Sequence, residues 1–188
     1  MTALIKDAFS VAKAVPDDIA GMMACVRDAQ KYLSRCEVDQ WQNGYPNESV
    51  ILRDIELGNA YVAKSPNGRL AGIMTLVFSD EPSYAHIYGG EWRFSGEKYA
   101  TLHRLAVRAE FRGGGLAFAL LRAAQSEAAI RGVSVLRADT HRDNMTMQGF
   151  LQKHGFERRG VIYLADGSER LAFDTRINMS TDEKVDYD

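Results

Sequence analysis

A run of three glycines, Gly113 to Gly115, stands between a segment that favours a strand and one that favours a helix. Glycine lets the backbone come close to a ligand, and the helix that follows begins with unpaired N–H groups and a partial positive charge. This combination predicts a cradle for a phosphate group. A flexible turn is the alternative interpretation of the same three residues.

Two common phosphate-binding loops do not fit this stretch. A Walker loop ends in Gly-Lys followed by Ser or Thr, which is absent here, and a dinucleotide fingerprint needs a third glycine where Phe118 stands. The loop therefore predicts a phosphate-bearing ligand of another kind.

The elements that must position this loop follow from the spacing of apolar residues. Strands are predicted over residues 9–15, 60–64, 70–78, 101–107, 133–140, 161–164 and 170–177, and helices over 16–33, 48–57, 116–131 and 144–154. Residues 41–46 read as a loop, and residues 79–98 have too little periodicity to assign beyond an extended loop or irregular hairpin. We expect one domain over residues 1–178 and a polar, acidic tail over residues 179–188.

Composition narrows the class of protein. The chain has 188 residues, of which 46% are hydrophobic and 26% charged, as in a soluble globular protein with one sizeable core. A net charge of -2 gives no basic field for nucleic acid or an anionic membrane. The two cysteines, Cys25 and Cys36, form neither a disulfide framework nor a metal motif, so we expect no metal and a reducing cytoplasm. No segment reaches about 18 apolar residues, and the first residues lack an export pattern, so neither export nor membrane insertion is expected.

Two blocks of residues resemble the GNAT superfamily of N-acetyltransferases. Leu105-Ala106-Val107, four residues and then Arg112-x-x-Gly115-x-Ala117 are similar to its acyl-CoA loop. Asn144, Met147 and the pair Gly155-Phe156 are similar to its Asn-x-x-Ala…Gly-Phe pattern, with Met147 in place of alanine. The order of elements over residues 9–177 also agrees.

The resemblance implies an α/β (α+β) fold, the GNAT fold. Its central sheet is mixed and mostly antiparallel, with about seven strands, about four flanking helices and a splayed pair of strands that takes acyl-CoA. Three stretches narrow the resemblance to small bacterial acetyltransferases with undefined acceptors: residues 103–107, 139–141 and 148–156.

This resemblance also implies an activity. The expected reaction moves an acetyl group from the co-substrate acetyl-CoA to a primary amine of a small molecule or peptide by direct attack in a ternary complex, and it leaves free coenzyme A. A non-catalytic acyl-CoA-binding regulatory module is the alternative. Dimers are frequent in the superfamily, so a homodimer is one expectation, and no nucleic acid or membrane partner is expected.

The family's cofactor contacts carry over residue by residue. The backbone of the strand would form hydrogen bonds with the pantetheine arm and with the thioester carbonyl. The amides of the loop would bind the pyrophosphate, and Arg112, with Arg108 or Lys153, would pair with the negative charge of the phosphates. Asn144 would bond pantetheine, although an asparagine there is equally expected as a helix N-cap. The full set is Leu105, Ala106, Val107, Arg112, Gly113, Gly114, Gly115, Leu116, Ala117, Asn144 and Lys153.

Catalysis requires a base, since an amine is mostly protonated near neutral pH. His103 is the first candidate, because it lies on the strand that leads to the thioester and would share a face with Thr101 and Leu105. A structural histidine is the alternative. His141 is the second candidate, with Asp139 to orient its ring, although that pair could equally pin a turn.

The leaving thiolate and the acceptor pocket complete the prediction. A tyrosine that protonates the thiolate in many relatives corresponds here to Leu151, so Tyr163, water or an unprotonated departure must replace it. Aromatic residues near the first two helices and residues 79–98 are candidates to wall an amphiphilic or cationic amine, with a core role as the alternative. They are Trp41, Tyr45, Trp92 and Tyr99.

Overall fold

The computed structural model describes residues 9–177, so the predicted tail over residues 179–188 and its boundary lie outside the described part. Four helices and seven strands follow the predicted order. They are β1 (Ser10–Lys13), α1 (Ile19–Arg35), α2 (Glu48–Glu56), β2 (Ala60–Lys64), β3 (Leu70–Val77), β4 (Tyr99–Val107), α3 (Leu116–Ile130), β5 (Val135–Thr140), α4 (Met145–Lys153), β6 (Glu157–Tyr163) and β7 (Glu169–Arg176).

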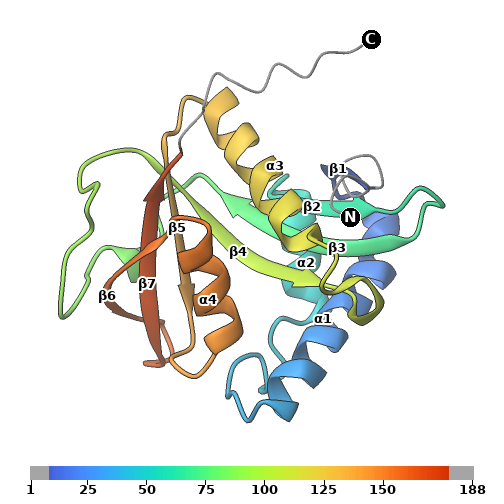
Figure 1. Cartoon of the computed structure of the whole chain (residues 1–188), viewed down its shortest axis with the longest axis horizontal. Helices are drawn as coiled ribbons and strands as arrows, with labels where there is room; N and C mark the ends of the chain where they lie inside the picture. The colour runs from blue at the N-terminus through green and yellow to red at the C-terminus, as the bar shows by residue number, and fades with distance from the viewer. Residues whose placement is uncertain (1–8, 178–188) are drawn as a thin grey trace.

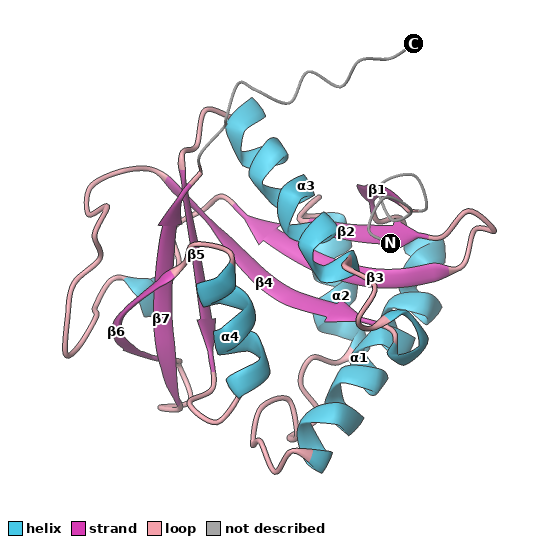
Figure 2. Ribbon diagram, in the orientation of Figure 1, coloured by secondary structure: helices cyan, strands magenta, loops and turns pink. Residues whose placement is uncertain are grey.

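The seven strands form one sheet in the order β1-β2-β3-β4-β5-β7-β6. Only β4 and β5 pair in parallel, and every other pair is antiparallel. This mixed, mostly antiparallel sheet with four helices confirms the predicted fold class (Figure 2). The main difference is at β6, which begins at Glu157 rather than at residue 161, because Arg158 and Gly160 flank an irregularity that hides the alternation.

Alternating side chains divide the core between the two faces of the sheet. Tyr61 and Ala63 of β2 pack beneath α3, whereas Ala60 and Val62 pack against α1. Both α1 and α3 contact β3 and β4, and they lie on opposite faces (Figure 1). The half of the sheet that carries the glycine loop is therefore covered on both sides.

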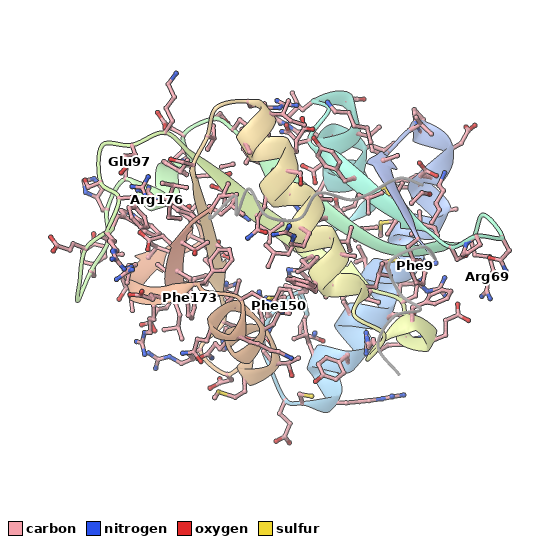
Figure 3. The ribbon with its side chains drawn as sticks, turned by 45° about the horizontal axis from the view of Figure 1, so that its top comes forward. Phe9, Arg69, Glu97, Phe150, Phe173 and Arg176 are labelled. Atoms are coloured by element: carbon pink, nitrogen blue, oxygen red, sulfur yellow. The ribbon has the colours of Figure 1, made fainter. Side chains whose placement is uncertain are left out.

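The other half of the sheet is covered differently. Helix α4 packs on the face that α3 also covers, through Leu151. The opposite face is covered by residues 79–98, from which Tyr84 and Trp92 bury their rings against Ile162 and Ala172. An ion pair between Glu97 and Arg176, both labelled in Figure 3, holds this long connection to β7. The segment that showed no periodicity thus has a packed aromatic layer.

Strands β4 and β5 pair over only three positions. Tyr99 to Thr101 lie beside Val135 to Arg137, and after that the two strands separate while each continues towards its C-terminal end (Figure 1). Backbone groups on the facing edges beyond Thr101 have no strand partner across the gap. The gap opens toward α4 on one side and α1 on the other (Figure 1).

A β-bulge interrupts β4 in its second half. Ile73 pairs with Ala106 and Thr75 with His103, so two residues, Arg104 and Leu105, lie opposite Met74. Arg104 has φ 53°, a left-handed conformation that costs a non-glycine residue about 1–2 kcal/mol. The extra residue changes which side chains share a face.

Candidate functional site

A large cavity occupies the gap between β4 and β5. Its volume is about 1250 Å³, and its lining runs from the glycine loop, through the C-terminal half of β4, to His103 and Asp139. Pockets of about 300–1,000 Å³ hold most small ligands. This cavity therefore has room for a long ligand and a second, smaller molecule.

The glycine loop adopts the conformation that its residues favour. Gly113 and Gly115 both have φ +79°, where a side chain would be strained. Gly115 is the N-cap of α3 and contributes no side-chain hydrogen bond, while its carbonyl accepts from the N–H of Ala119. The N–H groups of the first turn consequently have no partner within the helix, and they lie at the edge of the cavity.

Helix α1 holds this loop in place through hydrogen bonds to Asp28, and we call these contacts the brace. The Arg112 guanidinium donates to the carbonyl of Asp28 at 2.8 Å and to that of Val107 at 3.3 Å. The Asp28 carboxylate accepts from Arg108 Nε at 2.8 Å and from the N–H of Ala109 at 3.0 Å. Burial alone would raise the pKa of Asp28, but these donors hold it below its ordinary value. Arg112 and Arg108 therefore fix the loop to α1.

The edge of β4 that faces the gap presents backbone donors. The N–H of Arg108 donates to the carbonyl of Ala71 on β3 at 2.9 Å. Since successive N–H groups of a strand point to opposite edges, those of Val107 and Leu105 turn away from β3 and into the gap. The strand thus offers hydrogen bonds to a ligand that lies between β4 and β5.

His103 belongs to a network of ionisable groups at the far end of the cavity. Its Nε2 lies 3.0 Å from Glu81 Oε1, and its Nδ1 lies 4.0 Å from Asp139 Oδ1. The hydrogen bond from His103 lowers the pKa of Glu81, which therefore accepts as a carboxylate. The tautomer that donates from Nε2 to Glu81 would leave the lone pair of Nδ1 on the side of Asp139.

Tyr84 also contacts Asp139 and fixes its carboxylate. Its hydroxyl donates to Asp139 Oδ1 at 2.7 Å, and burial, followed by the Asp139 charge, raises the pKa of Tyr84 well above its ordinary value. The tyrosine therefore stays protonated and keeps donating. Trp92 in turn packs against Tyr84 in a tilted arrangement, with ring centroids 5.2 Å apart.

The bulge residue Arg104 has its own partners on the α2 side. Its Nη1 lies 2.9 Å from Asp54 Oδ2, which also accepts from Thr75 Oγ1 at 3.0 Å. Burial raises the pKa of Asp54, while the charge of Arg104 acts against that rise. The guanidinium also lies 5.6 Å from the centre of the Tyr45 ring. These contacts stabilise the strained backbone of Arg104.

The connection between α1 and α2 lines the cavity and contacts the residues that follow β5. We call residues 36–47 the strap. Gln40 Oε1 accepts from Asn144 Nδ2 at 2.9 Å and from the N–H of His141 at 3.3 Å. Just before the strap, the Tyr32 hydroxyl forms a 2.7 Å hydrogen bond with Thr146 Oγ1. Helix α1 and the strap are therefore linked to the start of α4 and to the residues before it.

Most residues predicted to bind a cofactor line the cavity. This holds for ten of the eleven, while Gly114 lies in the loop behind the lining. Asn144 is also a helix N-cap, because its Oδ1 accepts from the N–H of Met147 at 3.0 Å. The lining residues of this set are Leu105, Ala106, Val107, Arg112, Gly113, Gly115, Leu116, Ala117, Asn144 and Lys153.

Of the three predicted catalytic residues, only His103 lines the cavity. His103 and Leu105 both line the cavity, but they do not share a face of the strand as expected, because the bulge turns the partly buried Leu105 towards the core beneath α3. The ring of His141 accepts from the N–H of Asp143 at 3.2 Å and is outside the lining. Tyr163 is 46% exposed and packs edge-on against Tyr88, also outside the lining.

Of the four aromatic residues predicted to line the acceptor pocket, two line the cavity. Trp41 and Tyr45, from the strap, line the cavity. Trp92 and Tyr99 lie one layer behind it, where they enclose the Arg137 guanidinium at 4.1 and 3.9 Å from their ring centres. Burial lowers the pKa of Arg137. Trp92 and Tyr99 therefore support the network around His103 indirectly, by packing against Tyr84.

Sequence reasoning missed Glu81, Tyr84, Gln40 and Tyr32. Glu81 and Tyr84 come from the unassigned segment, and their partners are 22 and 55 residues away along the chain. No pattern of neighbouring residues in the sequence indicates such contacts.

Among residues 9–177, no group of three or more His, Cys, Asp or Glu could hold a metal ion, and no helix there is long and apolar enough to cross a membrane.

Comparison with known proteins agrees with this geometry. Residues 26–156 match the model of the acetyltransferase (GNAT) family. A crystal structure of a GNAT-family acetyltransferase from Streptococcus agalactiae is 35% identical, with a TM-score of 0.81 over 90% of this chain and 95% of that one. An uncharacterized N-acetyltransferase from Bacillus subtilis, YesJ, is 25% identical over 92% of this chain and 93% of its own.

One further similarity concerns the fold. The PaiA N-acetyltransferase of Thermoplasma acidophilum, solved in complex with coenzyme A, is 16% identical, with a TM-score of 0.67 over 89% of this chain and 98% of that one.

Proposed function

Since the chain belongs to the acetyltransferase (GNAT) family, it is an acetyltransferase, and we propose that it moves an acetyl group from acetyl-CoA to a primary amine of a small molecule or peptide. One observation carries this proposal. A single cavity joins a glycine loop at a helix N-terminus, a strand edge with free N–H groups and a histidine whose ring nitrogens face Glu81 and Asp139. The resemblance stated from the sequence and the coenzyme A complex of PaiA support the choice of cofactor.

The cofactor would bind chiefly through backbone groups. The amides of the glycine loop and the first turn of α3 would hold the pyrophosphate. The N–H groups of Leu105 and Val107 would pair with the pantetheine arm and the thioester carbonyl. A donor aimed at that carbonyl stabilises the oxyanion that forms when the amine attacks. Arg112 would act mainly through the loop that it braces.

The acceptor amine would bind between His103 Nδ1 and Asp139, which are 4.0 Å apart. Asp139 attracts the ammonium form, and the His103 lone pair removes a proton before attack on the thioester. Glu81 orients the ring by accepting from Nε2. Trp41 and Tyr45 would cover the rest of the acceptor.

Departure of the thiolate would not use the position occupied by Leu151, which is apolar and 1% exposed. Because Tyr163 and His141 lie outside the cavity lining, we propose that solvent in the open cavity protonates the thiolate. The reaction then forms the amide bond, breaks the thioester bond and releases free coenzyme A. The ammonium nitrogen loses two protons, one to His103 before attack and one to solvent as the thioester bond breaks; solvent returns one proton to the thiolate and takes the other from His103.

The test combines binding with turnover. Calorimetry should detect coenzyme A bound at one site per chain, and thiol release should rise with the concentration of at least one amine in a panel of small amines and peptides. Mass spectrometry of the product should show one added acetyl group. Coenzyme A binding with no thiol release for any amine would support a non-catalytic module, and an absence of binding would overturn the cofactor assignment.

A further inference from the structure

Arg104 lines the cavity next to His103, and the proposed reaction gives it no role. Thr75 pairs with His103 across β3 and β4, and its hydroxyl contacts Asp54 of α2, so both residues face α2. Consecutive side chains of a strand normally point to opposite faces. Arg104 nevertheless reaches Asp54 too, because its left-handed backbone, with φ 53°, turns its side chain to the same face. The bulge therefore brings a guanidinium to the face of β4 that carries the imidazole.

One side of the Arg104 guanidinium is held by a buried counter-ion. Asp54 is 7% exposed, and its Oδ2 lies 2.9 Å from Arg104 Nη1. The Nε of the same guanidinium is buried and finds no hydrogen-bond partner among residues 9–177. Buried donors in native proteins are nearly always paired. A ligand that accepts a hydrogen bond from the edge formed by Nε and Nη2 would supply the missing partner.

The ionisable groups around His103 differ in what they face. Glu81 interacts with His103 and Asp54 pairs with Arg104, and both carboxylates lie outside the cavity lining. Asp139 and Arg104 belong to the lining, so a ligand beside His103 meets a carboxylate and a guanidinium. A simple amine would match Asp139 but would leave the guanidinium edge unpaired. A molecule with an ammonium group and a carboxylate would match both.

Charged residues from the strap and from the β6–β7 connection also line the cavity. Asp39 and Asp166 are exposed, and an Asp166 oxygen accepts from the N–H and the hydroxyl of Ser168. Arg170 adds a charge of the opposite sign to the same lining. Exposed charges are screened by water and salt, so these carboxylates would attract a second ammonium group only weakly. The less exposed charges beside His103 are therefore expected to select the acceptor.

We propose that the acceptor is an amino acid, whose ammonium group binds at His103 and Asp139 while its carboxylate binds Arg104. This inference rests on the proposed function, because it names the acceptor class of the same site. A guanidinium matches a carboxylate through parallel N–H···O bonds, which fix the orientation of the bound molecule and add affinity. The Tyr45 ring, centred 5.6 Å from the guanidinium, would shield this pair from water. The carboxylate forms and breaks no bond in the reaction, and the product is the N-acetyl amino acid.

The experiment compares each amino acid with the amine that remains when its carboxylate is removed: alanine with ethylamine, phenylalanine with phenethylamine, and lysine with cadaverine. Thiol release gives kcat/KM for every compound. The wild-type protein should favour the amino acid of at least one pair by about 30-fold, the effect of one charge-assisted contact. Arg104→Gln should abolish that preference by raising KM for the amino acid, while kcat/KM for the paired amine stays within about twofold.

A second variant guards against misfolding. Asp54→Asn combined with Arg104→Gln leaves no buried carboxylate unpaired, and it should lose the same preference. The matched control is Arg53→Gln, which removes an exposed positive charge beside Asp54 on α2 and should keep the preference.

Three outcomes would overturn the inference. Equal losses for both members of a pair, in both Arg104 variants, would mean that the guanidinium only supports His103. A wild-type preference for the amines, or for peptides alone, would reject an amino acid as acceptor but leave the proposed function intact. Coenzyme A binding without thiol release from any of these compounds, or from the wider amine panel, would reject the proposed function itself.

Discussion

The two ends of the cavity are built in different ways. At the phosphate end, the proposed contacts come from backbone amides whose positions depend on glycine conformations within a few residues of one another. At the acceptor end, the contacts come from side chains of Glu81, His103 and Asp139, which the fold brings together from three separate segments. Backbone amides suit a ligand that a whole family shares, because they do not depend on side-chain type. A choice among acceptors requires side chains, because these can differ from one protein to the next.

Breaking the phosphate end should have the largest effect. Gly115→Glu introduces a side chain at φ +79° and a negative charge where phosphate would bind. Loss of two charge-assisted hydrogen bonds of about 2 kcal/mol each corresponds to about a thousandfold loss of acetyl-CoA affinity. Calorimetry measures it. Gly132→Glu is the control, since Gly132 has φ +70° at the far end of α3 and carries the same strain. Equal loss in both variants would refute the cradle.

Breaking the acceptor end should lower turnover without lowering cofactor affinity. His103→Gln retains a donor for Glu81 but removes the lone pair that accepts the proton, so we expect kcat to fall about a hundredfold and the acetyl-CoA Kd to stay unchanged. The control is His86→Gln, at an exposed position in residues 79–98. The measurement is the rate of thiol release between pH 6 and 9. Full activity in His103→Gln throughout that range would exclude His103 as the base.

The brace from α1 shows that the phosphate end also depends on distant residues, and its stability should vary with pH. The pKa of Asp28 is lower in the folded protein than its ordinary value of 3.8, so its contribution is present above that value and is lost as the pH falls through the folded-state pKa. Asp28→Asn should therefore lower the free energy of unfolding by about 1 kcal/mol near pH 7, and by progressively less below pH 4.

Urea unfolding from pH 3 to 7 tests this expectation, and a double-mutant cycle with Arg108→Gln isolates the ion pair. A difference that stays constant down to pH 3 would mean that the carboxylate charge contributes nothing to the brace.

The smallest expected effect lies at the boundary between the two ends. Gln40 accepts from the Asn144 side chain, which is also predicted to bond pantetheine, so cofactor and strap would compete for one amide. Gln40→Ala should raise acetyl-CoA affinity about fivefold, because the cofactor would no longer displace a hydrogen bond of about 1 kcal/mol. Gln42→Ala is the control, since its side chain bonds only to the carbonyls of Gln30 and Gln40. Weaker binding in Gln40→Ala would instead mean that Gln40 positions Asn144 for the cofactor.

The same contrast explains what the sequence could predict. The glycine turn, the helix after it and the N-cap at Asn144 depend on neighbouring residues, and the structure confirms the predicted element order and the cap. The family resemblance depends on those local blocks. The start of β6 was wrong by four residues, because an irregular strand has no clean alternation.

The acceptor end could be predicted only in part. Trp41, Tyr45 and His103 line the cavity, but nothing near His103 in the sequence indicates that Glu81 orients it. The pairing of Tyr84 with Asp139 depends on how residues 79–98 fold over the sheet. Contacts of this kind follow from packing across the whole domain rather than from spacing along the chain.

The bulge at Arg104 has a consequence for insertions and deletions. Before it, Leu102 faces α3 and His103 faces Glu81 and Asp139; after it, Leu105 again faces α3 and Ala106 faces α1. The one additional residue keeps both segments of β4 in phase with their own surroundings. Loss of a single residue here would turn one segment over and exchange buried leucine for polar side chains. We therefore expect a one-residue deletion within this strand to disrupt the fold more than a one-residue deletion at an exposed position of residues 79–98.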